Sequence, residues 1–288
     1  MINFLKYRWL YFLISAIVIG AGMFSIVNWG FRYSIDFTGG TNLEYRFDKN
    51  IKEKDIRTIS LDNKVEITDL KLDENNLVLK TKPLTDEKMM QLKAAFGHYL
   101  NAKITTLRSE TVGPLLGREA INKTIVASIL AIIGILIYMS FAFKGFNFAI
   151  SAVLAMLHDL LVVVGTYSLL CHFFGAEVDM MFVTAVLTTM SFSVHDTIVI
   201  FDKIREDDQL GESNNVEEAA NKALTETMVR SINNSMTIIF MLLALTLMGG
   251  STIRFFIMTL LIGTITGTYS SPFIATPILV WLEKRKSP

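Results

Sequence analysis

Two His–Asp dipeptides interrupt long apolar stretches of this sequence, at His158–Asp159 and at His195–Asp196. An ionised aspartate at the centre of a membrane helix costs roughly 2.5–3.5 kcal/mol on insertion scales, so it is expected to face other helices or water. A carboxyl group in that position either exchanges protons or holds helices together through hydrogen bonds worth about 0.6–2 kcal/mol. For an isolated intramembrane aspartate both interpretations stay open.

Asp196 has a candidate partner on the next apolar stretch. At 1.5 Å per residue, Asp196 lies about 26 Å along its helix from Asp179, and Arg230 lies about 29 Å along the following helix from Gly249. The two helices run in opposite directions, so both side chains are expected at a similar depth, toward the cytoplasm. A guanidinium favours the ionised carboxylate and desolvation opposes it. Separation of the pair therefore favours proton uptake, and its formation favours proton release.

The remaining chemical candidates are weaker. His195 either relays protons, because histidine titrates near neutral pH, or donates a hydrogen bond to a neighbouring helix. Asp159, with His158 beside it, is a second candidate for proton coupling. It ranks below Asp196, because no basic partner is apparent at its depth. The sequence has one cysteine and shows no phosphate-binding loop, metal-ligand cluster or nucleophile–base arrangement. We therefore expect no enzymatic activity, no metal and no cofactor apart from a coupling ion, H⁺ or Na⁺.

Six apolar runs are long enough to cross a bilayer, which takes about 20 helical residues. Hydrophobic residues make up 51% of the 288-residue chain and charged residues only 19%. The runs are 9–27, 124–143, 148–170, 180–201, 231–248 and 255–282. Lysine and arginine gather before the first run, after the last, and in the short loops after the second and fourth, which places both termini in the cytoplasm. The first run is expected to stay as an anchor rather than be cleaved as a signal peptide.

Residues 31–118 form a charged insert that is expected to fold outside the membrane. Alternating apolar residues predict strands at 41–47, 64–72, 77–81 and 102–112. Helices are predicted at 53–60 and 85–100, the second capped by Thr85. The β-α-β-β-α-β order is typical of a small α+β ferredoxin-like domain. The chain thus divides into 1–30, 31–118 and 119–288. Its cytoplasmic loop at 203–229 is expected to be helical around 216–228, and it is either a solvated connector that extends the fourth and fifth spans or a docking surface.

A small residue recurs at every fourth position of the last apolar run, at Gly263, Gly267, Ser271 and Ala275. Such a series lets another helix approach closely, and ordinary bundle packing is the favoured interpretation. Pro272 and Pro277 are expected to interrupt this helix, as membrane helices tolerate.

Six motifs in register resemble the SecF family of the SecD–SecF protein-export complex. They are IDFTGGT (35–41), VGPLLGREA (112–120), LHDLLV (157–162), SVHDTIVIFDKIRE (193–206), RSINNSMT (230–237) and IGTITGTYSSPFIATP (262–277). The family's DFTGG signature corresponds to Asp36, Phe37, Thr38, Gly39 and Gly40. The resemblance implies a membrane all-α six-helix bundle, similar to half of a resistance-nodulation-division transporter.

The same resemblance implies a function. Members of the family are held to couple the proton-motive force to polypeptide export across the bacterial cytoplasmic (inner) membrane. The implied partners are a SecD-like subunit, a SecY-type channel and the translocating polypeptide, without nucleic acid. The family's proposed coupling carboxylate and arginine correspond to Asp196 and Arg230. His195 stands where the family usually has asparagine, and Phe192 where tyrosine is common, so the role of residue 195 stays open. The alternatives are a structural subunit that moves no ions and a half-size exporter of lipid or drug.

Overall fold

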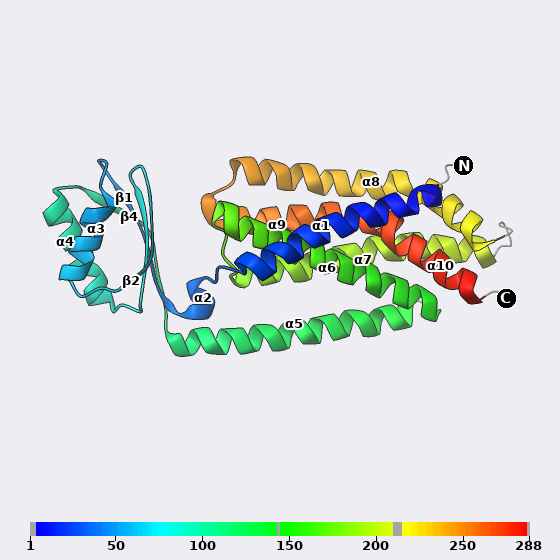
Figure 1. The fold of residues 1–288 in the computed structure, drawn as a ribbon, viewed down its shortest axis with the longest axis horizontal. Coiled ribbons are helices and arrows are strands. Elements are labelled where there is room, and N and C mark those ends of the chain that lie inside the picture. Colours follow the sequence, from blue (N-terminus) through cyan, green and yellow to red (C-terminus); the bar gives the residue numbers. More distant parts are fainter. Residues whose placement is uncertain (1–3, 143–144, 210–214, 287–288) are drawn as a thin grey trace. The chain divides into compact units, whose positions relative to one another are not determined.

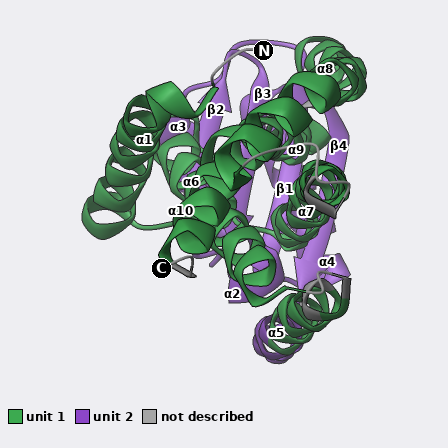
Figure 2. Cartoon of the chain, turned by 90° about the vertical axis from the view of Figure 1, so that its right-hand side faces the viewer, with its two compact units in different colours: residues 1–32, 126–288 green, residues 33–125 purple. Residues whose placement is uncertain are grey.

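The structure is a computed structural model that describes residues 4–142, 145–209 and 215–286. The chain divides into two compact units, residues 1–32 with 126–288 and residues 33–125 (Figure 2). Within the described residues, six helices are long and apolar enough to cross a membrane. This confirms the predicted six-helix membrane bundle.

The larger unit is built from long helices that run alongside one another (Figure 1). A short 3-10 helix, η1 (Phe4–Tyr7), leads into α1 (Arg8–Trp29). The other helices are α5 (Pro114–Ala142), α6 (Phe146–Phe174), α7 (Met180–Gln209), α8 (Val216–Met248), the 3-10 turn η2 (Ser251–Ile253) and α9 (Arg254–Ser270). The first turns of α5 belong to the smaller unit.

The last span is broken at the predicted place. A π-helical turn, η3 (Ser271–Ala275), separates α9 from α10 (Thr276–Lys286). Pro272 lacks a backbone N–H and cannot donate to the helix ladder, and the ladder bond shifts so that the Thr276 N–H reaches the Ser271 carbonyl. Isolated π-helical turns in α-helices are frequent at functional sites.

Glycines set two close helix crossings in this unit. A Cβ added to Gly263 would lie 2.2 Å from Thr189 Cγ2, and one added to Gly267 would lie 3.1 Å from Ser193 Cα. Gly263 and Gly267 of the small-residue series therefore face α7. Gly22 on α1 and Gly165 on α6 make the second crossing, where an added Cβ would lie 2.7 Å from the partner's Cα. Neither of these two glycines stands out in the sequence.

The smaller unit is an α+β domain with the predicted element order. Its strands are β1 (Gly40–Phe47), β2 (Ile67–Asp73), β3 (Asn76–Thr81) and β4 (Ile104–Val112), and its helices are α3 (Glu53–Asp62) and α4 (Asp86–Leu100). The strands form one antiparallel sheet in the order β2-β3-β1-β4. This is the strand order of a ferredoxin-like fold. The core consists of buried side chains from the sheet and both helices, among them Leu43, Phe47, Ile56, Leu79, Leu92 and Phe96.

Two details of this unit differ from the prediction. Thr85 occupies the N-cap position of α4, but its side chain makes no capping hydrogen bond. The second span begins as a helix at Pro114, ten residues before its predicted start, and residue 143 lies outside the described residues.

The DFTGG segment forms a joint with the start of α5. Its first residues make one helical turn, α2 (Ile35–Thr38), and Gly39 and Gly40 follow with φ of +71° and +140°, which L side chains rarely adopt. A Cβ on Gly39 would lie 2.8 Å from Pro114 Cα, and one on Gly117 would lie 2.9 Å from the Phe37 carbonyl oxygen. Because this joint holds the first turns of α5, the compact unit extends to residue 125, beyond the predicted boundary at 118.

Candidate functional site

Asp196 is buried in the interior of the helical unit. It lies on α7 with 7% of its surface exposed. Its Oδ1 accepts a 2.7 Å hydrogen bond from the Ser231 hydroxyl of α8, and its Oδ2 has no hydrogen-bond partner among the described residues. A buried carboxyl oxygen without a donor is costly. Half of this group's hydrogen-bonding capacity is therefore available for a proton or a mobile donor.

Arg230 does not contact Asp196 in this structure. It is exposed, whereas the adjacent Ser231 faces α7 and is buried. Successive residues point about 100° apart on a helix, so only one of the two can face the carboxyl group at a time. The predicted ion pair is thus absent here, and the arrangement corresponds to the separated half of the predicted exchange. Ser231, one residue after Arg230 on α8, makes the observed contact with Asp196 instead.

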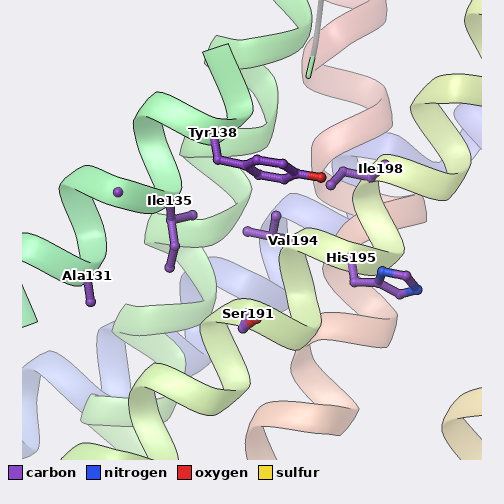
Figure 3. Close-up of a pocket in the computed structure, with 8 residues that line it drawn as sticks. Ala131, Ile135, Tyr138, Ser191, Val194, His195 and Ile198 are labelled. Atoms are coloured by element: carbon purple, nitrogen blue, oxygen red, sulfur yellow. The ribbon is translucent and has the colours of Figure 1, made fainter. Parts of the chain in front are cut away.

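His195 lies on the other side of α7 from the buried network. It is exposed and lines a pocket of about 450 Å³ between α5 and α7. Tyr138 projects from α5 toward α7 across this pocket (Figure 3). Ser191, also exposed, lies one helical turn before His195 on the same side. The histidine is therefore accessible from outside the bundle, and both roles given for it stay predictions.

Asp159 is the most fully engaged acidic group of the helical interior in the described part of the chain. It is 4% exposed and lies on α6. Its Oδ1 lies 2.8 Å from His158 Nδ1, and its Oδ2 accepts from the hydroxyls of Ser270, at 2.6 Å, and of Ser193. Asp159 thus joins α6, α7 and α9. Sequence reasoning missed this cluster, because the serines lie 34 and 111 residues away along the chain.

The surroundings of the two aspartates meet at Ser193. Its hydroxyl donates to Asp159, while its carbonyl accepts from the Thr197 hydroxyl at 3.1 Å. The Thr197 hydroxyl also lies 2.9 Å from Ser271 Oγ, and Ser271 lies beside the carboxyl group of Asp196. The two carboxyl groups therefore belong to one connected polar network inside the helical unit.

The loop predicted at 203–229 is mostly helical, and its residues 210–214 lie outside the described residues. Asp207, fully buried at the end of α7, lies 3.2 Å from Lys203 Nζ and 3.9 Å from Lys222 Nζ. On α8, buried Asn221 accepts hydrogen bonds from the backbone N–H groups of Phe4 and Leu5 in η1. This segment therefore continues α7 and α8 and holds the start of the chain against them.

No cluster suited to a metal ion occurs in the parts of the chain that the structure describes, where no three His, Cys, Asp or Glu residues gather. The polar network of Asp159 and Asp196 instead offers hydroxyl donors and carboxyl acceptors. The two carboxyl groups of this network are the groups that can bind and release protons.

Comparisons with known proteins agree with this architecture. Residues 91–285 match the family model described as "Protein export membrane protein SecD/SecF, C-terminal", and residues 24–51 match the "SecD/SecF GG Motif". The protein translocase subunit SecF of Thermobaculum terrenum is 39% identical, covering 99% of this chain and 95% of the relative. That of Anaerolinea thermophila is 37% identical, covering 98% of this chain and 94% of the relative.

The fold also matches a solved structure. The crystal structure of SecDF, a translocon-associated membrane protein from Thermus thermophilus, superposes with a TM-score of 0.85 at 31% identity. The match covers 99% of this chain but only 39% of the solved one. A second SecDF crystal structure, in a super-membrane-facing form, gives a TM-score of 0.65 at 32% identity with the same coverage.

Proposed function

Because this chain belongs to the SecD/SecF family of protein-export membrane proteins, as a SecF-type translocase subunit, we propose that it couples the proton-motive force to polypeptide export. Asp196 is the proposed proton-binding group, and Arg230 is its alternating partner. The observation that carries the proposal is the buried Asp196 carboxyl group, which has one oxygen bonded to Ser231 and the other without a partner among the described residues.

The proposed cycle exchanges Ser231 for Arg230 beside Asp196. A rotation of α8 by at most about 100°, one residue's step, brings the arginine to the carboxyl group. With Ser231 in place, the carboxyl group faces a neutral donor and takes up a proton. With Arg230 in place, the charge-assisted hydrogen bond favours the carboxylate and expels the proton. The membrane potential supplies about 2.3 kcal/mol per charge per 100 mV for this exchange.

The proposal extends to the surroundings of the chain. Both termini lie in the cytoplasm, residues 31–118 lie outside, and the membrane is the bacterial inner membrane. A SecD-like subunit supplies the second half of the bundle, since this chain covers 39% of the SecDF structure that it matches. The complex acts on the polypeptide that leaves a SecY-type channel, and the coupling ion is H⁺ or Na⁺. His195, His158 and Asp159 are secondary proton-exchange candidates.

The proposal is tested by replacing Asp196 with Asn in cells that depend on this chain for export. We expect the complex to assemble and export driven by the proton-motive force to be lost. The matched control is Asp202→Asn on the same helix, because Asp202 is exposed and pairs only with the nearby Arg205 among the described residues. Normal export with Asp196→Asn would overturn the proposal.

The alternative is a subunit that stabilises the assembly without moving ions. On that account Asp196→Asn leaves export intact, whereas a change that opens the helical bundle stops it. Gly267→Leu is such a change, because Gly267 packs against Ser193 within this chain. Export by the Asp196→Asn variant therefore separates the two functions.

A further inference from the structure

Two adjacent serines at the break in the last span contact both buried aspartate sites. Ser270 is the last residue of α9, and Ser271 is the first of the π-helical turn η3. Ser270 donates a 2.6 Å hydrogen bond to Asp159 Oδ2, while Ser271 bonds to Thr197 and lies beside Asp196. Both serines are completely buried. Two adjacent residues of the last span thus lie beside two carboxyl groups, which are carried by two other helices, α6 and α7.

The connection between the two carboxyl groups is not a proton wire. Between Asp159 and Thr197 it passes through the backbone carbonyl of Ser193, which accepts hydrogen bonds but carries no proton to pass on. A signal between the aspartates must therefore travel as a change in hydrogen bonding and position. The adjacent serines supply the second route, because a shift of one moves the other.

The π-helical turn is the part of the last span that can shift. Its Ser271 carbonyl accepts from both the backbone N–H and the side-chain hydroxyl of Thr276, the latter at 3.0 Å, and the following Pro272 has no N–H to donate. The Ser271 hydroxyl already has several acceptors within reach: Thr197 Oγ1 at 2.9 Å, the Gly267 carbonyl at 3.1 Å and the Ser193 carbonyl at 3.5 Å. A change at Asp196 can therefore redirect this hydroxyl without breaking the helix.

We propose that Asp159 is a positioning residue coupled to Asp196 through Ser270 and Ser271, so that proton binding at one aspartate changes proton binding at the other. This inference rests on the proposed function and deepens it. The free Oδ2 of Asp196 recruits the Ser271 hydroxyl when the carboxyl group ionises. The π-helical turn then shifts, and the Ser270 bond to Asp159 weakens.

The other titratable groups that face this network are few among the described residues. His158 contacts Asp159 directly, and its Nε2 is buried without a partner. Tyr269, next to Ser270, lies with its ring centroid 6.4 Å from that of His158 and donates its hydroxyl to the Tyr11 carbonyl. His195 is adjacent to Asp196 on α7, but its side chain is exposed and lines the pocket between α5 and α7. Each of these remains unchanged in the variants below.

The experiment measures the protonation of each aspartate separately. The chain and its SecD-like partner are reconstituted in vesicles and treated with dicyclohexylcarbodiimide, which labels protonated carboxyl groups, over a range of pH. Mass spectrometry gives the labelling midpoint of Asp159 and of Asp196. Ser270→Ala and Ser271→Ala remove one hydroxyl each and change no charge. Thr264→Val is the matched control, because among the described residues the buried Thr264 hydroxyl bonds only to the Leu260 carbonyl of its own helix.

The predicted result is that each serine substitution shifts the labelling midpoint of the aspartate that the serine does not lie beside. Ser270→Ala, which touches Asp159, shifts the labelling midpoint of Asp196 by about one pH unit, the size of a coupled titration. Ser271→Ala shifts the midpoint of Asp159 by a similar amount, the threonine substitutions restore both, and Thr264→Val changes neither. Shifts confined to the aspartate nearest each serine would overturn the inference. If proton flux through the complex still required Asp196, the proposed function would survive that result.

Discussion

Substitution of Gly263 by alanine is expected to force α7 and α9 apart. The added Cβ would lie 2.2 Å from Thr189 Cγ2 and 2.4 Å from Thr189 Cβ, so no rotamer change of the threonine removes the clash. The contact must open by about 1.2 Å to reach the 3.4 Å of ordinary contact. Overpacking of this kind costs roughly 1–3 kcal/mol.

The same movement reaches the polar network. Thr197 Oγ1 of α7 and Ser271 Oγ, in the turn η3 that directly follows α9, lie 2.9 Å apart, and a rigid opening of about 1.2 Å takes them beyond hydrogen-bond distance. We therefore expect Gly263→Ala to lower the free energy of unfolding by about 1–3 kcal/mol. It is also expected to reduce proton-dependent export, although Gly263 touches neither aspartate.

The assay is denaturation of the purified chain in mixed detergent micelles, with Gly20→Ala as the control. Gly20 also lies within a membrane helix, but an added Cβ there meets nothing within 4 Å. The control is expected to keep or raise stability, because alanine is the better helix former by about 1 kcal/mol. Equal stability of the two variants would refute the reasoning, since it would mean that α7 and α9 are not in close contact at Gly263.

Three further predictions concern the smaller unit. Gly39→Ala strains a backbone with φ of +71° and clashes with Pro114, so it should speed proteolysis after residue 113, whereas Gly113→Ala, which meets nothing within 4 Å, should not. Phe96→Ala leaves a cavity in the core of the smaller unit, so it should lower this unit's free energy of unfolding by about 3–5 kcal/mol, measured by hydrogen exchange. Burial raises the pKa of Tyr45 to about 12, so the unit's stability should be complete below pH 10 and fall between about 10 and 12. Tyr45→Phe should remove one late-ionising phenol from the ultraviolet titration, and an unchanged titration would contradict this.

Local patterns were sufficient to predict most of the elements of the chain. The alternation of Leu43, Tyr45 and Phe47 identified β1, and all three side chains are buried in the domain core. Apolar length identified the membrane helices, and Pro272 marked the break in the last one. These features depend on neighbours in the sequence, so they need no knowledge of the tertiary structure.

The site was only partly predictable, because its contacts depend on helix rotation. Depth along α8 selected the region of Arg230, but a 100° step decides that Ser231 is the residue that faces Asp196. The donors to Asp159 come from two other helices, and serines are too common in the sequence to mark them. The crossing of Gly22 with Gly165 had no signal either, since each is a single glycine in a long apolar run.

Proton flux through vesicles that contain this chain and its SecD-like partner tests the central claim most directly. With a membrane potential imposed, the parent complex should acidify or alkalinise the lumen according to the sign of the potential. The Asp196→Asn complex should lose that flux, while Asp202→Asn keeps it. Equal flux in the parent and Asp196→Asn complexes would contradict the account, because Asp196 is the proposed proton-binding group of the cycle.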